Sequence, residues 1–113
     1  MISVDQIRSI AMALPHVEEG PPVPAARRIA GFKVAGKSFL GVEAGGETIT
    51  VSLSESDAKK LAAEHPEIYE EIWRNKKIVV GLRANLSKLS ARSARELIEK
   101  SWRHTMATHS FTE

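Results

Sequence analysis

The sequence predicts an α+β fold: a two-layer sandwich in which a mainly antiparallel four-stranded sheet carries helices on one face, in the order α-β-β-β-α-β-α. Apolar and polar residues alternate over 28–53 and again over 77–83, the period of strands with one covered face. Before, between and after these segments, apolar residues recur three or four positions apart, as in amphipathic helices. The first strands follow one another within a few residues, which favours hairpins and therefore antiparallel pairing.

The first helix is expected to begin after Ser3. Ser3 and Gln6 have the spacing of a capping box, and the apolar residues from Ile7 onward then share one helical face. The helix should end near Pro15. The following "EEGPPVPAA" indicates a polar, proline-rich connection without regular structure.

Three strands in two hairpins are expected next. They cover "RIAGFKV", "KSFLGVE" and "TITVSL", with turns at Ala35-Gly36 and at "AGGE". A fourth strand follows in "NKKIVVGLR". Strict alternation there predicts Val80 and Leu82 beneath the helices, with Lys77 and Arg83 on the opposite face.

Two further helices have clear start signals. Ser54 should cap "ESDAKKLAAE", which His65-Pro66 then ends, and Ser90 should cap "ARSARELIEKSWRHTMA". Between the first of these and the fourth strand, "PEIYEEIW" is interpreted as another short turn of helix. The last helix has an apolar stripe formed by Ala94, Leu97, Ile98, Ser101 and Trp102.

Length and composition indicate one globular domain, residues 1–113. The chain is 42% hydrophobic and 27% charged, with a net charge of +2 and no cysteine, which excludes disulfides and thiolate chemistry. The N-terminus lacks the basic and apolar regions of a signal peptide, and no segment is apolar enough to span a membrane. A cytoplasmic protein without a membrane partner is therefore expected.

The segment "GFKVAGKS", residues 31–38, matches the pattern of a phosphate-binding loop. Such a loop requires a buried strand before its first glycine and a helix that starts at the lysine. Prolines precede this segment, and glycines and β-forming residues follow it. We therefore interpret it as a β-hairpin with Gly36 in the turn, and we expect no binding of a nucleotide triphosphate.

With these elements placed, the chain resembles the MmcQ/YjbR family. The resemblance extends over nearly the whole chain and depends on four segments: "ALPHVEEG", "FKVAGKSF", "LSESDAKKLAAEHPEIY" and "ELIEKSWRHTMA". It implies a CyaY-like α+β fold, also called a double-wing fold, and the DNA-binding role by which this family is usually described. It implies no catalytic residue.

Two stretches carry basic residues without acidic ones, "ARRIAGFKVAGKS" and "WRNKKIVVGLR". If both lie on the open face of the sheet or at its hairpin tips, they form a positive stripe suited to phosphates. The alternative is that exposed strands carry Lys and Arg only to remain soluble and unpaired. The candidate nucleic-acid contacts are Arg27, Arg28, Lys33, Lys37, Arg74, Lys76, Lys77 and Arg83.

The sequence thus favours a non-enzymatic module that binds duplex DNA weakly and without sequence preference. The alternative is a module that binds a protein or a small ligand, in which the basic groups only improve solubility. Neither a metal nor a cofactor is expected, because the four histidines have no ligand spacing with carboxylates. Ser101 and His104 lack a third group to orient them, so Ser101 is expected to pack within a helix. Trp73 and Phe39 could stack on bases, although core packing is the favoured role.

Overall fold

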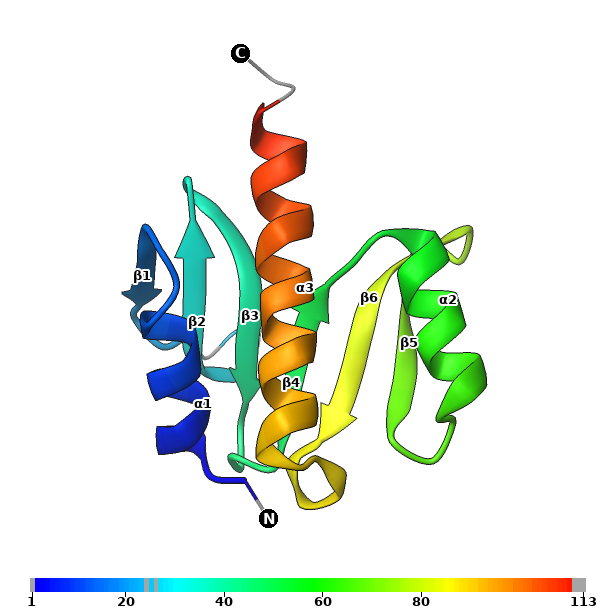
Figure 1. Cartoon of the computed structure of the whole chain (residues 1–113), viewed down its shortest axis with the longest axis horizontal. Helices are drawn as coiled ribbons and strands as arrows, with labels where there is room; N and C mark the ends of the chain where they lie inside the picture. The colour runs from blue at the N-terminus through cyan, green and yellow to red at the C-terminus, as the bar shows by residue number, and fades with distance from the viewer. Residues whose placement is uncertain (1, 24, 26, 111–113) are drawn as a thin grey trace.

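The computed structural model describes residues 2–23, 25 and 27–110, and it describes residues 108–110 by their backbone alone. The chain forms helices over one sheet (Figure 1). The elements are α1 (Val4–Met12), β1 (Val17–Gly20), β2 (Arg28–Val34), β3 (Lys37–Glu43), β4 (Thr48–Ser52), α2 (Glu55–Glu64), β5 (Tyr69–Arg74), β6 (Ile78–Asn85), the 3₁₀ turn η2 (Leu86–Lys88) and α3 (Ala91–Ser110).

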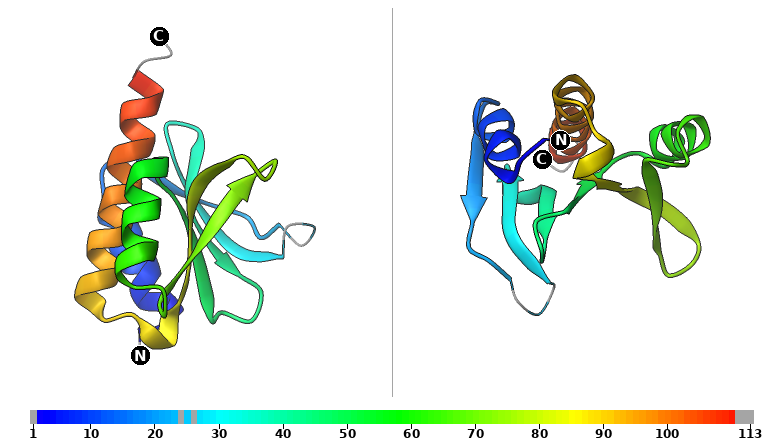
Figure 2. Two further views of the ribbon diagram at one scale, coloured as in Figure 1. Left: turned by 90° about the vertical axis from the view of Figure 1, so that its right-hand side faces the viewer. Right: turned by 90° about the horizontal axis from the view of Figure 1, so that it is seen from below.

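The sheet has six strands in the order β1-β2-β3-β4-β6-β5, and every neighbouring pair is antiparallel. All three helices lie on the same side of this sheet (Figure 2), with α3 packed across its middle strands and α2 against β5 and β6. The predicted α+β class and the one-sided helical cover are therefore confirmed. The predicted number of four strands is wrong, because both edge strands were missed.

The two missed strands, β1 and β5, have sequences that hide their conformation. In β1, "VEEG", Val17 is the only apolar residue, so nothing alternates. At β5 the apolar Ile68, just before the strand, and Ile72 within it stand four residues apart, which is the spacing of a helical face. Pairing with β6, where Tyr69 lies opposite Ala84 and becomes buried, decides the conformation instead.

The helix start signals are confirmed. At α1 the Ser3 hydroxyl accepts from the backbone N–H of Gln6 (3.2 Å), and the Gln6 side chain accepts from the N–H of Ser3 (2.9 Å), a complete capping box. Ser54 accepts from the N–H of Asp57 at α2, and Ser90 plays the same role at α3. Helix α1 ends at Met12, earlier than expected.

The segment that matched a phosphate-binding loop forms the hairpin between β2 and β3. Ala35 (φ 53°) and Gly36 (φ 79°) both adopt the left-handed conformation, as a two-residue turn of the primed type requires. The strand that follows Gly36 takes the place where a phosphate loop would need a helix. The hairpin interpretation is therefore confirmed.

The core lies between the sheet and the helices. Ala30, Val42, Ile49 and Ala84 are cross-strand neighbours on the covered face, and all are buried. The α3 stripe meets them, with Trp102 half-buried at its margin and the other predicted members buried: Ala94, Leu97, Ile98 and Ser101.

Strand β6 corrects the predicted alternation. Leu82 is buried in the core as expected, but its buried companion is Val79, whereas Val80 is half-buried and lines a hollow on the helix-free face. The cause is a bulge: Trp73 pairs with Val79 and the preceding Ile72 pairs with Gly81, so that Val80 is the extra residue. An inserted residue reverses the side on which each earlier residue of the strand points.

Candidate functional site

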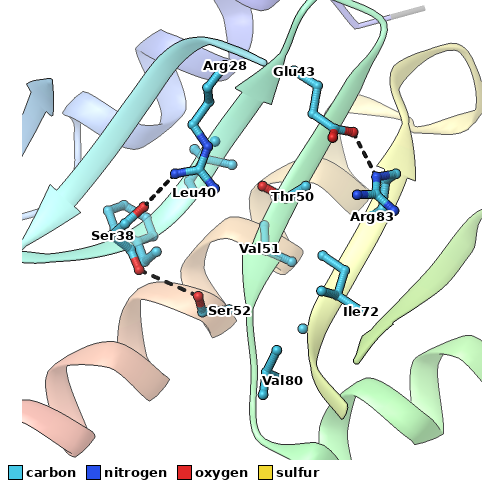
Figure 3. A pocket seen from close by; sticks show the side chains of 13 residues that line it. Arg28, Ser38, Leu40, Glu43, Thr50, Val51, Ser52, Ile72, Val80 and Arg83 are labelled. Atoms are coloured by element: carbon cyan, nitrogen blue, oxygen red, sulfur yellow. Dashed lines mark hydrogen bonds and ion pairs between the residues drawn. The ribbon is translucent and has the colours of Figure 1, made fainter. Parts of the chain in front are cut away.

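The helix-free face of the sheet is hollowed at its centre. Gly31, Gly41, Thr50 and Arg83 are cross-strand neighbours here, on β2, β3, β4 and β6. Two of the four have no side chain, so the surface is low at this point. Figure 3 shows side chains that surround it, among them Arg28, Glu43 and Arg83. The resulting cavity of about 300 Å³, here called the central hollow, is lined by Arg28, Ser38, Phe39, Leu40, Gly41, Glu43, Thr50, Val51, Ser52, Ile72, Val80, Gly81 and Arg83.

Arg28 lies flat across β2 and β3 at the margin of this hollow. A Cβ on Gly41 would stand 2.5 Å from the Arg28 Nε, so the missing side chain of Gly41 is what lets the guanidinium rest on the sheet. Arg28 Nη1 donates to Ser38 Oγ (3.3 Å). Among the described residues no carboxylate forms an ion pair with Arg28, and its side chain lines the hollow.

Arg83, on the opposite margin, is held by two carboxylates. Its Nε donates to Glu43 Oε1 (2.8 Å) and its Nη1 to Glu70 Oε1 (3.3 Å), while the Thr48 hydroxyl also donates to Glu43 Oε1 (2.8 Å). Burial would raise the pKa of Glu43, but the hydrogen bonds from Arg83 and Thr48 and the charges of Arg83 and Arg28 together hold that pKa below its ordinary value. The hydrogen bond and charge of Glu43 raise the pKa of Arg83 despite its partial burial. The charge of Arg83 is thus balanced locally.

A second cavity, the end hollow, adjoins the central one at the end of the sheet where β3 begins and β5 ends. It measures about 430 Å³, and no carboxylate is among the described residues that line it. Lys37 and Arg74 bring two positive charges to it. Its lining is Lys37, Ser38, Ser52, Leu53, Arg74, Val80, His104 and Thr105, so Ser38, Ser52 and Val80 belong to both hollows.

The other predicted contacts lie at the periphery. Lys76 and Lys77 are exposed in the β5–β6 turn, where Asn75 and Lys76 have positive φ and the Lys77 N–H donates to the Arg74 carbonyl (3.0 Å). The β5–β6 hairpin tip projects on the helix-free side (Figure 2). Arg27 is exposed in the turn before β2.

Lys33 is separate from this group. It is the cross-strand partner of Glu18 and lines another hollow with His16 and with Met106 of α3. The structure therefore brings Arg28, Lys37 and Arg74 together around two adjoining hollows, neutralises Arg83, and leaves Lys33 beside an acidic residue.

Sequence reasoning missed the acidic groups of this face, Glu43 and Glu70, and the hydroxyl group of Ser38. Glu43 and Arg83 are 40 positions apart, and they meet only because β4 pairs with both β3 and β6. The available signal was a glutamate at the end of an alternating strand, which by itself is typical of any exposed strand end.

The remaining candidates are assigned by their contacts. The buried Ser101 hydroxyl donates to the Phe39 carbonyl (2.6 Å), which confirms the packing role, and Phe39 is itself buried. Trp73, in contrast, is 49% exposed, with Lys59 Nζ 6.0 Å from its ring centre, so the favoured core role is wrong. No group of three potential metal-ligating side chains occurs within the described part of the chain.

Among residues 2–23, 25 and 27–110, no helix combines the length and the apolar character needed to cross a membrane.

Comparison with known proteins yields a family and a solved structure. The model of the YjbR family matches residues 12–104. The crystal structure of protein DR2400 from Deinococcus radiodurans, which carries the family domain DUF419, superposes with a TM-score of 0.70 at 24% identity and covers 90% of this chain and 77% of that one. No curated protein matches the sequence. At this identity the likeness of DR2400 concerns the fold.

Proposed function

The chain belongs to the YjbR family, and we propose that the helix-free face of its sheet, together with the adjoining end hollow, binds the phosphate backbone of nucleic acid, as a cytoplasmic, non-enzymatic module. The observation that carries this proposal is the end hollow. Lys37 and Arg74 come from different strands yet line one cavity in which no described residue is acidic. Lysine and arginine side chains and serine hydroxyls are groups that contact phosphate oxygens.

Neighbouring groups extend this positive surface. Arg28 faces the adjoining central hollow without an ion pair to any carboxylate of the described residues, and Lys76 and Lys77 flank Arg74 in the hairpin turn. Phosphate contacts fix the position of a nucleic acid but carry no sequence information. Binding is therefore expected to be weak and insensitive to sequence, with dissociation constants of about 10⁻⁴ to 10⁻⁶ M at physiological salt.

Salt dependence provides the test. If about four phosphates are contacted, the logarithm of the affinity for duplex DNA should fall against the logarithm of salt concentration with a slope of about −3.6. In the double variant Lys37→Ala/Arg74→Ala, two contacts are lost and the slope should flatten by about 1.8. Fluorescence anisotropy of a labelled duplex between about 50 and 200 mM salt measures both slopes.

The matched control is Lys60→Ala/Arg92→Ala, which removes the same charge from exposed positions on α2 and α3, on the covered side. This control should leave the slope nearly unchanged. Equal losses in both double variants would mean that only the net charge matters, and absence of binding at about 50 mM salt would reject the nucleic-acid role.

One observation favours the alternative function, a module that docks another protein. Trp73 on the edge strand β5 is 49% exposed, and Ile78 on the neighbouring strand β6 is 44% exposed. Aromatic residues are enriched at protein interfaces. A failed salt test, together with a purified partner whose binding depends on Trp73, would support this alternative.

A further inference from the structure

We propose that the central hollow receives an unpaired base, so that the preferred nucleic acid of this face is single-stranded. This inference rests on the proposed phosphate contacts and names the class of strand that makes them. It is carried by the shape and lining of the central hollow and by its continuity with the end hollow.

The planar guanidinium of Arg28 provides a surface for stacking. Its side chain lies over Gly31 and Gly41, held flat because neither residue has a Cβ, and Nη1 is fixed by Ser38 Oγ. A guanidinium plane fixed in this way can stack on a base and add a cation–π attraction. Lysine has no such plane, so the role depends on arginine specifically.

The remaining lining suits the rest of a base. Ile72 and Val80 contribute apolar groups near the lower end of the hollow in Figure 3. Glu43 accepts hydrogen bonds from Arg83 and Thr48 at Oε1, and no hydrogen bond from a described residue is made to its Oε2. Thr50 adds a hydroxyl that can donate or accept. Mixed polar groups around an apolar wall are the usual lining of a small-molecule pocket, and about 300 Å³ is within the usual size range.

Continuity between the hollows fits one nucleotide. Ser38, Ser52 and Val80 line both, so a base in the central hollow leaves its phosphate beside Lys37 and Arg74 in the end hollow. In a duplex the bases are stacked and paired, and their faces cannot enter a cavity without flipping. An unpaired strand has no such cost, which is why it should bind more tightly here.

The experiment compares three labelled ligands of about 12 nucleotides by fluorescence anisotropy: oligothymidine, a duplex, and an abasic strand with the same phosphates and no bases. Oligothymidine should bind about tenfold more tightly than the abasic strand, the gain expected from one stacked base, and more tightly than the duplex. Arg28→Lys keeps the positive charge but loses the guanidinium plane, so it should remove this advantage and change the affinity for the abasic strand much less. The matched control is Arg27→Lys, the same change at an exposed neighbour, and it should preserve the advantage.

A second variant displaces the Arg28 guanidinium without substituting Arg28 itself. Gly41→Ala places a methyl group against the Arg28 side chain, lifts the guanidinium from the sheet, and should also lower the oligothymidine affinity. Equal affinities for oligothymidine and the abasic strand, or equal effects of Arg28→Lys and Arg27→Lys, would overturn the base pocket and leave the phosphate contacts standing. If none of the three ligands binds, the proposed function itself fails. Thymidine monophosphate that binds as tightly as the strand would overturn the assignment to a strand.

Discussion

The two faces of this sheet are built from the same strands in opposite ways. On the covered face, Ala30, Val42 and Ile49 form a continuous buried row across β2, β3 and β4. One residue away along each strand, the helix-free face has Gly31, Gly41 and Thr50 in the matching row. Aliphatic side chains fill one layer, whereas the other layer is left low and bordered by arginine.

This difference indicates which positions of the sheet should tolerate substitution. The covered row is closed by helices, and any substitution there must fit among fixed neighbours. The helix-free row borders a hollow, so a new side chain there displaces flexible groups or solvent. Substitutions at residues whose surroundings differ in this way test the contrast directly.

The largest difference is expected at Leu82 and Val80. Leu82→Asp places an unpaired charge in the core, which costs several kcal/mol against a total stability of about 5–15 kcal/mol, and should abolish the cooperative unfolding transition. Val80→Asp, on the hollow, should remain folded with a loss below about 2 kcal/mol. Thermal and denaturant unfolding followed by circular dichroism measure both. Similar losses for the two variants would contradict the bulge in β6.

The next contrast compares two glycines. A Cβ on Gly81 would collide with the backbone carbonyl of Val51, whereas the atoms nearest to one on Gly41 belong to the Arg28 side chain. Because the backbone of a paired strand cannot move away as a side chain can, Gly81→Ala should lower the free energy of unfolding by about 3 kcal/mol. Gly41→Ala needs only a new rotamer and should cost less than about 1 kcal/mol. Denaturant midpoints determine both values, and the reverse order would show that Arg28 is more tightly fixed than its contacts indicate.

A smaller effect, dependent on pH, is expected from Glu43 on the helix-free face. Its folded pKa lies below the ordinary 4.5. The carboxylate therefore contributes stability that is fully present above about pH 4.5 and is lost as the pH falls through the folded pKa. Glu43→Gln should lower the unfolding free energy by about 1 kcal/mol at neutral pH, discounted for partial exposure. The difference from the unmodified protein should shrink in acid, and a constant difference from pH 7 to about pH 3 would argue against the ion pair with Arg83.

The smallest effect should come from the helical surface. Arg92 and Glu96 pair at 3.1 Å on α3, with their side chains 89% and 67% exposed. Solvent screens such a pair, so Arg92→Ala should change the unfolding free energy by less than about 0.5 kcal/mol. A loss as large as that of Glu43→Gln would remove the distinction between the two ion pairs.

The covered face was predictable from the sequence to the extent that its pattern is periodic and local. Ser3, Ser54 and Ser90 mark helix starts through bonds to residues three positions away, and Leu82 follows from alternation. The position of Val80 could not be predicted in this way. The face on which its side chain lies depends on a bulge in the pairing with β5, and β5 was not recognised as a strand from the sequence.

The candidate site was predictable in its residue types and less so in its arrangement. Arg28, Lys37 and Arg74 lie in two stretches of the sequence that contain basic residues and no acidic ones. Glu43 and Glu70 reach Arg83 only through long-range strand pairing, and no local pattern announces a pairing between distant segments. The neutralisation of the Arg83 charge therefore depends on the tertiary structure.

The edges of the sheet affect how readily this protein aggregates at high concentration. Both outermost strands could in principle recruit a strand from another molecule and begin aggregation. At one edge β1 is only four residues long and is followed by Pro21-Pro22, which cannot extend a ladder of hydrogen bonds. At the other edge, β5 carries Glu70 and Glu71 and lies beside the bulge in β6. The sheet therefore resists growth at both ends, and its hollowed face stays accessible.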